Sequence, residues 1–169
     1  MQALAVVAVA LAMSLTDPAA AADTPGHDAA QTHQNTQKKA GSRAAADKPF
    51  GREGDPRKVN RVITIDMSDT MRFFPSEIRV KRGDTIRFVL RNSGEHPHEV
   101  VLGTVDDLKK QALARKNVER ARGEAHAAHI ESGANGHIVW QFTRPGEFHY
   151  ACLIPGNFEA GMMGTIVVR

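Results

Sequence analysis

Apolar and polar residues alternate along several short segments of the chain from residue 59 to the C-terminus. Alternation with a period of two is typical of β-strands that are buried on one face. It predicts strands at residues 61–66, 77–80, 85–92, 99–102, 138–142, 147–152 and 165–168. Gly, Pro, Asn and Asp separate these segments, as they do in turns between strands. The pattern therefore predicts an all-β sandwich or barrel, with Trp140 and Phe142 pointing into its core.

One stretch, about residues 104–123, departs from this pattern and predicts a helical insertion between two strands. Thr104 and Asp107 have the spacing of a capping box at the start of a helix, and Gly123 suits its end. The apolar stripe of the segment is thin, and six basic residues follow its acidic first turn. We expect a surface helix whose basic face is solvated or meets an acidic partner.

The N-terminal part of the chain has a different composition. Residues 3–15 are apolar but shorter than the roughly 20 residues that span a bilayer, and an Ala-rich A-x-A sequence follows them. This predicts a signal peptide over residues 1–22, with a buried Ala-rich helix as the alternative. Residues 23–58 are polar and Ala-rich, which predicts a disordered linker ahead of a folded domain at 59–169. After cleavage such a chain keeps no membrane anchor.

Charge and cysteine content narrow the classes of function. The chain has 22 Lys and Arg against 19 Asp and Glu, a net charge of +3, and so mild a surplus does not indicate nucleic acid. A single cysteine rules out an internal disulfide and a Cys₄ zinc site. Cys152 is therefore either a small core residue or a reactive or metal-binding thiol.

Three residues with soft or borderline donor atoms stand near ends of predicted strands. Cys152 ends one strand, Met162 lies ten residues later before the last strand, and His98 directly precedes another strand. A thiolate, a thioether and an imidazole are the donors that favour copper among the biological metals. The three residues are thus candidate ligands of one copper ion.

The segment from Phe148 through Cys152, Pro155 and Gly156 to Met162 resembles the copper-binding loop of the cupredoxins, the plastocyanin/azurin family. Further motifs resemble an exported branch of that family linked to copper tolerance. They begin at Asp69 (DTMRFFP), Val80 (VKRGDT) and His98 (HEVVLGT). The resemblance implies a Greek-key cupredoxin β-sandwich with a helical insertion between the ligand-bearing strands, and one bound copper ion. It implies that His98 and Cys152 are equatorial ligands and that Met162 is axial.

At one position the chain departs from the family. The residue after Pro155-Gly156 is a second histidine ligand in cupredoxins, and here it is Asn157. An amide oxygen is a harder donor than imidazole and competes poorly for copper. Three hypotheses follow. In the first, His98, Cys152 and Met162 bind copper, best as Cu(I), and water or the Asn157 amide completes the site. In the second, His126 and His129 act as auxiliary ligands if their segment is helical. In the third, the site has lost its metal.

These observations predict an exported, periplasmic copper-binding protein that serves copper tolerance or handling. Its partners would be the copper ion and a redox or copper-transfer protein. A small blue-copper electron carrier is one alternative, and a copper-free module that binds a partner protein is another. The sequence contains no Ser/His/Asp or paired-carboxylate arrangement that would indicate an enzyme.

Overall fold

The computed structural model describes residues 47–114 and 123–169. The predicted signal peptide, most of the predicted linker and the second half of the helical insertion lie outside these residues. Among the helices that are described, none has the length and apolar character needed to cross a membrane.

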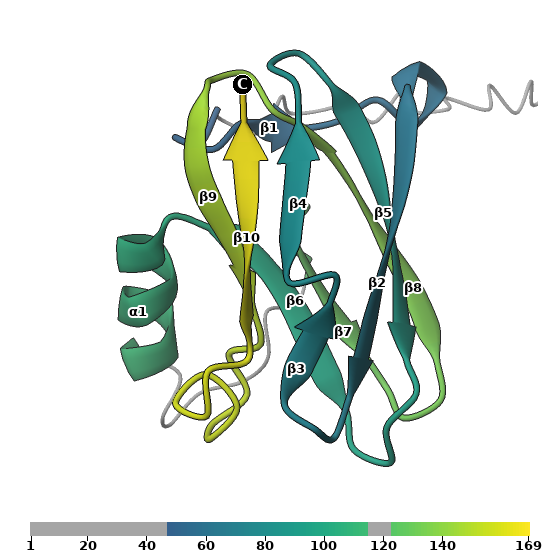
Figure 1. The fold of residues 1–169 in the computed structure, drawn as a ribbon, viewed down its shortest axis with the longest axis vertical. Coiled ribbons are helices and arrows are strands. Elements are labelled where there is room, and N and C mark those ends of the chain that lie inside the picture. The colour runs from purple at the N-terminus through teal and green to yellow at the C-terminus, as the bar shows by residue number, and fades with distance from the viewer. Residues whose placement is uncertain (1–46, 115–122) are drawn as a thin grey trace, which may run out of the picture. The chain divides into compact units, whose positions relative to one another are not determined.

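The described residues form two five-stranded sheets that face each other (Figure 1). The first sheet has the order β1 (Arg52–Glu53), β8 (Asn135–Gln141), β5 (Thr85–Asn92), β2 (Arg61–Ser68) and β3 (Arg72–Phe74). The second has the order β4 (Glu77–Val80), β10 (Met163–Val168), β9 (Gly146–Ala151), β6 (His98–Gly103) and β7 (Ala127–Ile130). Two neighbouring pairs, β2 with β5 and β4 with β10, run parallel. The predicted all-β sandwich is confirmed.

The core lies between the two sheets and is built from alternate residues of the strands, as the period of two requires. Phe88 and Trp140 of the first sheet and Tyr150 of the second are 2% exposed or less. Phe142, just after β8, is fully buried, so the predicted inward orientation of Trp140 and Phe142 is correct. Burial of these large apolar side chains is the main contribution that holds the sheets together.

The ordered domain begins earlier than the predicted boundary between linker and domain. Phe50 is 3% exposed and stacks on Trp140 at a ring-centroid distance of 5.2 Å. The Phe50 carbonyl also accepts a hydrogen bond from the Trp140 indole at 3.0 Å, and β1 pairs with β8. A short 3-10 helix, η1 (Pro56–Lys58), follows. The structure thus packs part of the predicted linker, residues 47–58, against the domain, because one aromatic anchor can order an otherwise polar segment.

The predicted insertion begins as helix α1 (Val105–Ala114), which packs on the outer face of the second sheet (Figure 1). Thr104 caps the helix as predicted, since its Oγ1 accepts from the Asp107 amide at 3.2 Å, and the same hydroxyl donates to the Asp107 carboxylate at 2.7 Å. Leu108 is fully buried in a small cluster with Val101 and Leu153. The insertion therefore covers the back of the strand that begins at His98.

Candidate metal centre

The predicted ligands lie at one end of the sandwich, where β6 begins and the loop between β9 and β10 turns back (yellow loop at the bottom of Figure 1). Cys152 directly follows β9, and Met162 directly precedes β10. The Cys152 amide donates to the Met162 carbonyl at 3.1 Å, which closes the loop at its base. Within the loop, the Met162 amide donates to the Asn157 carbonyl at 2.9 Å. The antiparallel register of the two strands thus brings Cys152 and Met162 together.

The alternation of side chains along β6 and β9 turns the candidate donors inward. His98, Cys152 and Met162 are each 0% exposed. The neighbours of Cys152 in sequence, Ala151 and Leu153, belong instead to the cluster beneath α1. The inward orientation of the three side chains is therefore set by strand parity.

Two of the donor atoms converge on one point. The Asn157 amide nitrogen, Nδ2, lies 3.2 Å from Cys152 Sγ and 3.2 Å from His98 Nδ1. The Asn157 residue is itself buried, with 7% of its surface exposed. A sulfur and an imidazole nitrogen that share one neighbouring atom point toward a common centre, and Asn157 bridges them by hydrogen bonds in this structure.

The environment of Cys152 keeps its thiol neutral. Burial raises the pKa of Cys152, while hydrogen bonds from Asn157 and from the Glu99 amide at 3.4 Å act in the opposite direction. The Glu99 side chain accepts a hydrogen bond from the Leu153 amide at 3.1 Å and so holds the start of the loop. Because only the thiolate binds metal, a metal that enters here displaces the thiol proton.

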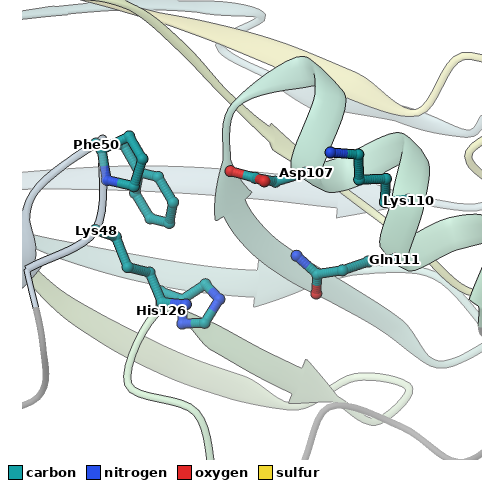
Figure 2. A pocket seen from close by; sticks show the side chains of 7 residues that line it. Lys48, Phe50, Asp107, Lys110, Gln111 and His126 are labelled. Carbon is teal, nitrogen blue, oxygen red and sulfur yellow. The ribbon is translucent and has the colours of Figure 1, made fainter.

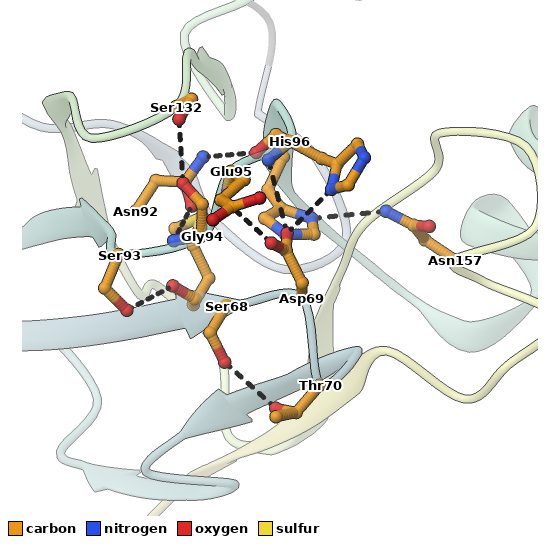
Figure 3. A network of polar contacts seen from close by, with 12 residues as sticks. Ser68, Asp69, Thr70, Asn92, Ser93, Gly94, Glu95, His96, Ser132 and Asn157 are labelled. Carbon is orange, nitrogen blue, oxygen red and sulfur yellow. Dashed lines mark hydrogen bonds and ion pairs between the residues drawn. The ribbon is translucent and has the colours of Figure 1, made fainter.

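Two polar residues that the sequence analysis did not select hold the turn before His98 (Figure 3). Asn92 is 3% exposed, and its amide nitrogen donates to the carbonyls of His96, Ile130 and Glu131 at 2.8–3.1 Å. Asp69 accepts hydrogen bonds from the same turn and contacts the His98 ring. Asn92 was visible in the sequence only as part of a turn signal, and Asp69 only as part of a family motif.

The structure does not bring the two auxiliary histidines into this cluster. His129 lies in a strand, β7, and His126 lies in the turn just before it, so the two are not on the helix that the hypothesis required. His126 lies beside Phe50 in a pocket of about 290 Å³ (Figure 2), where its ring packs 5.9 Å from that of Trp140. His129 is paired in register with Glu99, on the outer face of the sheet.

His149 also lies on the outer face, as its spacing from Cys152 predicts. Its Nε2 atom is 3.6 Å from the Glu147 carboxylate. His96 is near the cluster, but its side chain is 74% exposed and its Nδ1 atom is 3.4 Å from Asp69.

The donor set fits a soft monovalent metal better than a four-ligand blue-copper site. In the described part of the chain no three His, Cys, Asp or Glu side chains gather as a metal-binding group. Among the described residues the third candidate donor is the thioether of Met162, whose side chain is fully buried in the same core. Thiolate, thioether and imidazole together suit Cu(I).

Comparisons with known proteins also indicate a copper-binding family. The family model described as copper binding proteins of the plastocyanin/azurin family matches residues 59–169. A protein of Rubrivivax gelatinosus named copper-resistant cuproprotein CopI is 48% identical over 146 residues, which cover 85% of each chain. A protein of the same name from Vibrio cholerae is 29% identical over 111 residues, covering 64% of this chain and 66% of the other.

A solved structure of auracyanin B superimposes with a TM-score of 0.60. That match covers 73% of this chain and 99% of the other, at 21% sequence identity. So low an identity supports the likeness of fold alone.

Proposed function

This chain belongs to the copper-binding plastocyanin/azurin family, and from that premise we propose that it is an exported protein that binds one copper ion for copper tolerance. His98, Cys152 and Met162 are the proposed ligands. Two relatives named as copper-resistant cuproproteins support the role in tolerance. The apolar run at residues 3–15 supports export, and we propose the periplasm as the destination.

One observation carries the choice of ligands: Cys152 Sγ and His98 Nδ1 both lie 3.2 Å from the same atom, Asn157 Nδ2. The convergence of two side chains from different strands on one buried atom supports a shared binding site or a packing contact. Asn157 fills the position as a hydrogen-bond donor, and its nitrogen has no lone pair to offer a metal. Binding therefore requires Asn157 to turn aside and release both hydrogen bonds.

The same residue favours capture over electron transfer. A rigid four-ligand site changes little between Cu(I) and Cu(II), whereas three soft donors favour Cu(I). Bound copper would be held through its affinity for soft donors, and the chain provides those donors in a buried position that excludes water. We therefore propose holding and delivery of Cu(I) as the function of the site.

The test is an anaerobic titration of the protein with Cu(I) against a competing chelator. We expect one ion per chain, and we expect Cys152→Ser to abolish stoichiometric binding because the thiolate is lost. His149→Gln is the matched control, since that histidine is half-buried on the outer face of the same sheet. An unchanged titration in Cys152→Ser would contradict the proposed ligands, and the absence of any binding would favour a copper-free module.

A further inference from the structure

We propose that Asp69 is a positioning residue for this centre, whose carboxylate holds the His98 ring with Nδ1 directed toward Cys152 and thereby strengthens copper binding. The inference rests on the proposed function, because it takes His98 as a ligand. Asp69 follows β2 in the first sheet, whereas His98 opens β6 in the second. The contact between them therefore joins the two sheets beside the metal centre.

The Asp69 carboxylate is the point where several bonds meet (Figure 3). Its Oδ2 atom accepts from the Glu95 amide at 2.7 Å. Its Oδ1 atom lies 3.3 Å from the His96 amide nitrogen and 3.2 Å from His98 Nε2. One side chain thus holds both the backbone that leads into His98 and the far side of the His98 ring.

The chemistry of these groups selects one form of the ring. An ionised carboxylate only accepts hydrogen bonds, so the ring nitrogen that faces Asp69, Nε2, carries the proton of a neutral His98. The lone pair is then on Nδ1, the atom that faces Asn157 Nδ2 at 3.2 Å. The amide nitrogen of Asn157 only donates, so the contacts on both sides of the ring agree on the same tautomer.

This tautomer is the one that a metal needs at the point shared with Cys152. A carboxylate behind a ligating imidazole also makes its lone pair more basic, and loss of such a partner costs roughly 10- to 100-fold in metal affinity. Asp69 is only partly buried, with its side chain 34% exposed, whereas the His98 side chain is 0% exposed. The carboxylate therefore keeps its charge in contact with water while it orients a ring that water does not reach.

The experiment compares the wild-type chain with Asp69→Asn and Asp69→Ala, and uses Asp84→Asn as the matched control. Asn keeps an oxygen that can accept from the Glu95 amide, so it preserves the turn while it removes the charge. Asp84 is also a turn carboxylate, and it accepts from the Lys81 amide at 2.9 Å. It lies at the opposite end of the eight-residue strand β5 from Asn92, about 26 Å from the site end.

The first readout is ¹⁵N NMR of the His98 ring in the metal-free protein. We expect a proton on Nε2 and none on Nδ1 in the wild type, with a mixture of tautomers in Asp69→Ala. A wild-type ring that carries its proton on Nδ1 would overturn the proposal. This measurement uses no copper, so it stands whether or not the proposed copper function holds.

The second readout is Cu(I) affinity by chelator competition. We expect Asp69→Asn to bind about tenfold or more weakly and Asp84→Asn to bind as the wild type does. Equal affinity in Asp69→Asn and the wild type would overturn the proposal. If Asp69→Ala fails to fold, Asp69→Asn carries the test alone. Failure of the wild type to bind copper would contradict the proposed function, and the NMR result would still decide which tautomer of the His98 ring Asp69 favours.

Discussion

On the inner face of the second sheet His98, Cys152 and Met162 gather at one end, whereas on the outer face His129, His149 and Met163 stay apart. The outer histidines each lie near a carboxylate two residues away in sequence, at 3.3 Å for His129 and 3.6 Å for His149. Met163 packs in the apolar cluster beneath α1. The same residue types therefore have different surroundings within a single sheet.

The difference shows that strand parity and register, more than residue type, decide which donors meet. Met162 and Met163 are adjacent in sequence, yet one is fully buried in the core cluster and the other belongs to the outer cluster. His98 and His129 lie on neighbouring strands, but the register pairs His98 with Ile130 and His129 with Glu99. A shift of one residue would exchange the two faces.

The largest expected effect comes from restoring an imidazole on the inner face. Asn157→His supplies a fourth donor at the position where an amide now bridges Cys152 and His98. We expect the parent chain to stay nearly colourless when mixed with Cu(II), whereas Asn157→His becomes intensely coloured. The reason is that a site of two histidines and a thiolate binds Cu(II) with strong charge-transfer absorption. Visible spectroscopy measures it. The same weak spectrum in the variant and the parent would show that the remaining donors are not arranged for copper.

Replacing one histidine on each face of the second sheet tests directly whether only the inner face binds copper. We expect His98→Gln to weaken Cu(I) binding by about a thousandfold, on the order of 4 kcal/mol, because an inner donor is lost. His129→Gln removes a histidine from the outer face and should leave the affinity unchanged. Chelator competition measures both variants. An equal loss of Cu(I) affinity in His98→Gln and His129→Gln would contradict the assignment of the binding site to the inner face.

The pH dependence of binding follows from the state of the thiol. Burial raises the pKa of Cys152, so the thiol is protonated at neutral pH and each Cu(I) displaces one proton. Apparent affinity should rise about tenfold per pH unit, roughly a hundredfold between about pH 6 and 8, and level off only above the raised thiol pKa. Competition titrations at several pH values, corrected for the chelator, measure the slope. A flat profile would contradict thiolate binding at Cys152.

The smallest effect is expected from the adjacent methionines. Met162→Leu keeps the volume of the side chain, so it should cost less than about 1.5 kcal/mol of stability, while it removes a soft donor. We expect Cu(I) affinity to fall about tenfold in Met162→Leu. Met163→Leu, on the outer face, should bind as the parent does. Thermal melts and chelator competition separate the two effects, and a greater loss in Met163→Leu would reverse the assignment.

Much of the fold could be predicted from the sequence because its strands are long enough to show alternation. The predicted segments at 85–92 and 165–168 correspond to β5 and β10. The strands that were missed are short or ambiguous: β1 has two residues, β3 has three, and β7 is a four-residue run that begins with two alanines. The early start of the domain was missed because the docking of Phe50 on Trp140 is a tertiary contact.

The candidate site was predictable only in part. His98, Cys152 and Met162 were selected from donor chemistry and motif, and the structure buries all three side chains completely. The contacts of Asp69 were not predictable, because they depend on how two sheets meet. The bridging position of Asn157 follows from the turn of the loop. In that turn the backbone amide of Asn157 donates to the Ile154 carbonyl at 3.0 Å.

The complete burial of Cys152 has a consequence for the lifetime of the protein without its metal. Oxidants and foreign disulfides attack thiolates that they can reach, and this thiol is 0% exposed, neutral and hydrogen-bonded to Asn157. The chain has no second cysteine with which to form an internal crosslink. We therefore expect the thiol to resist sulfenic acid formation and intermolecular disulfide formation even in an oxidising compartment, so that under the proposed function it would stay reduced and able to bind copper.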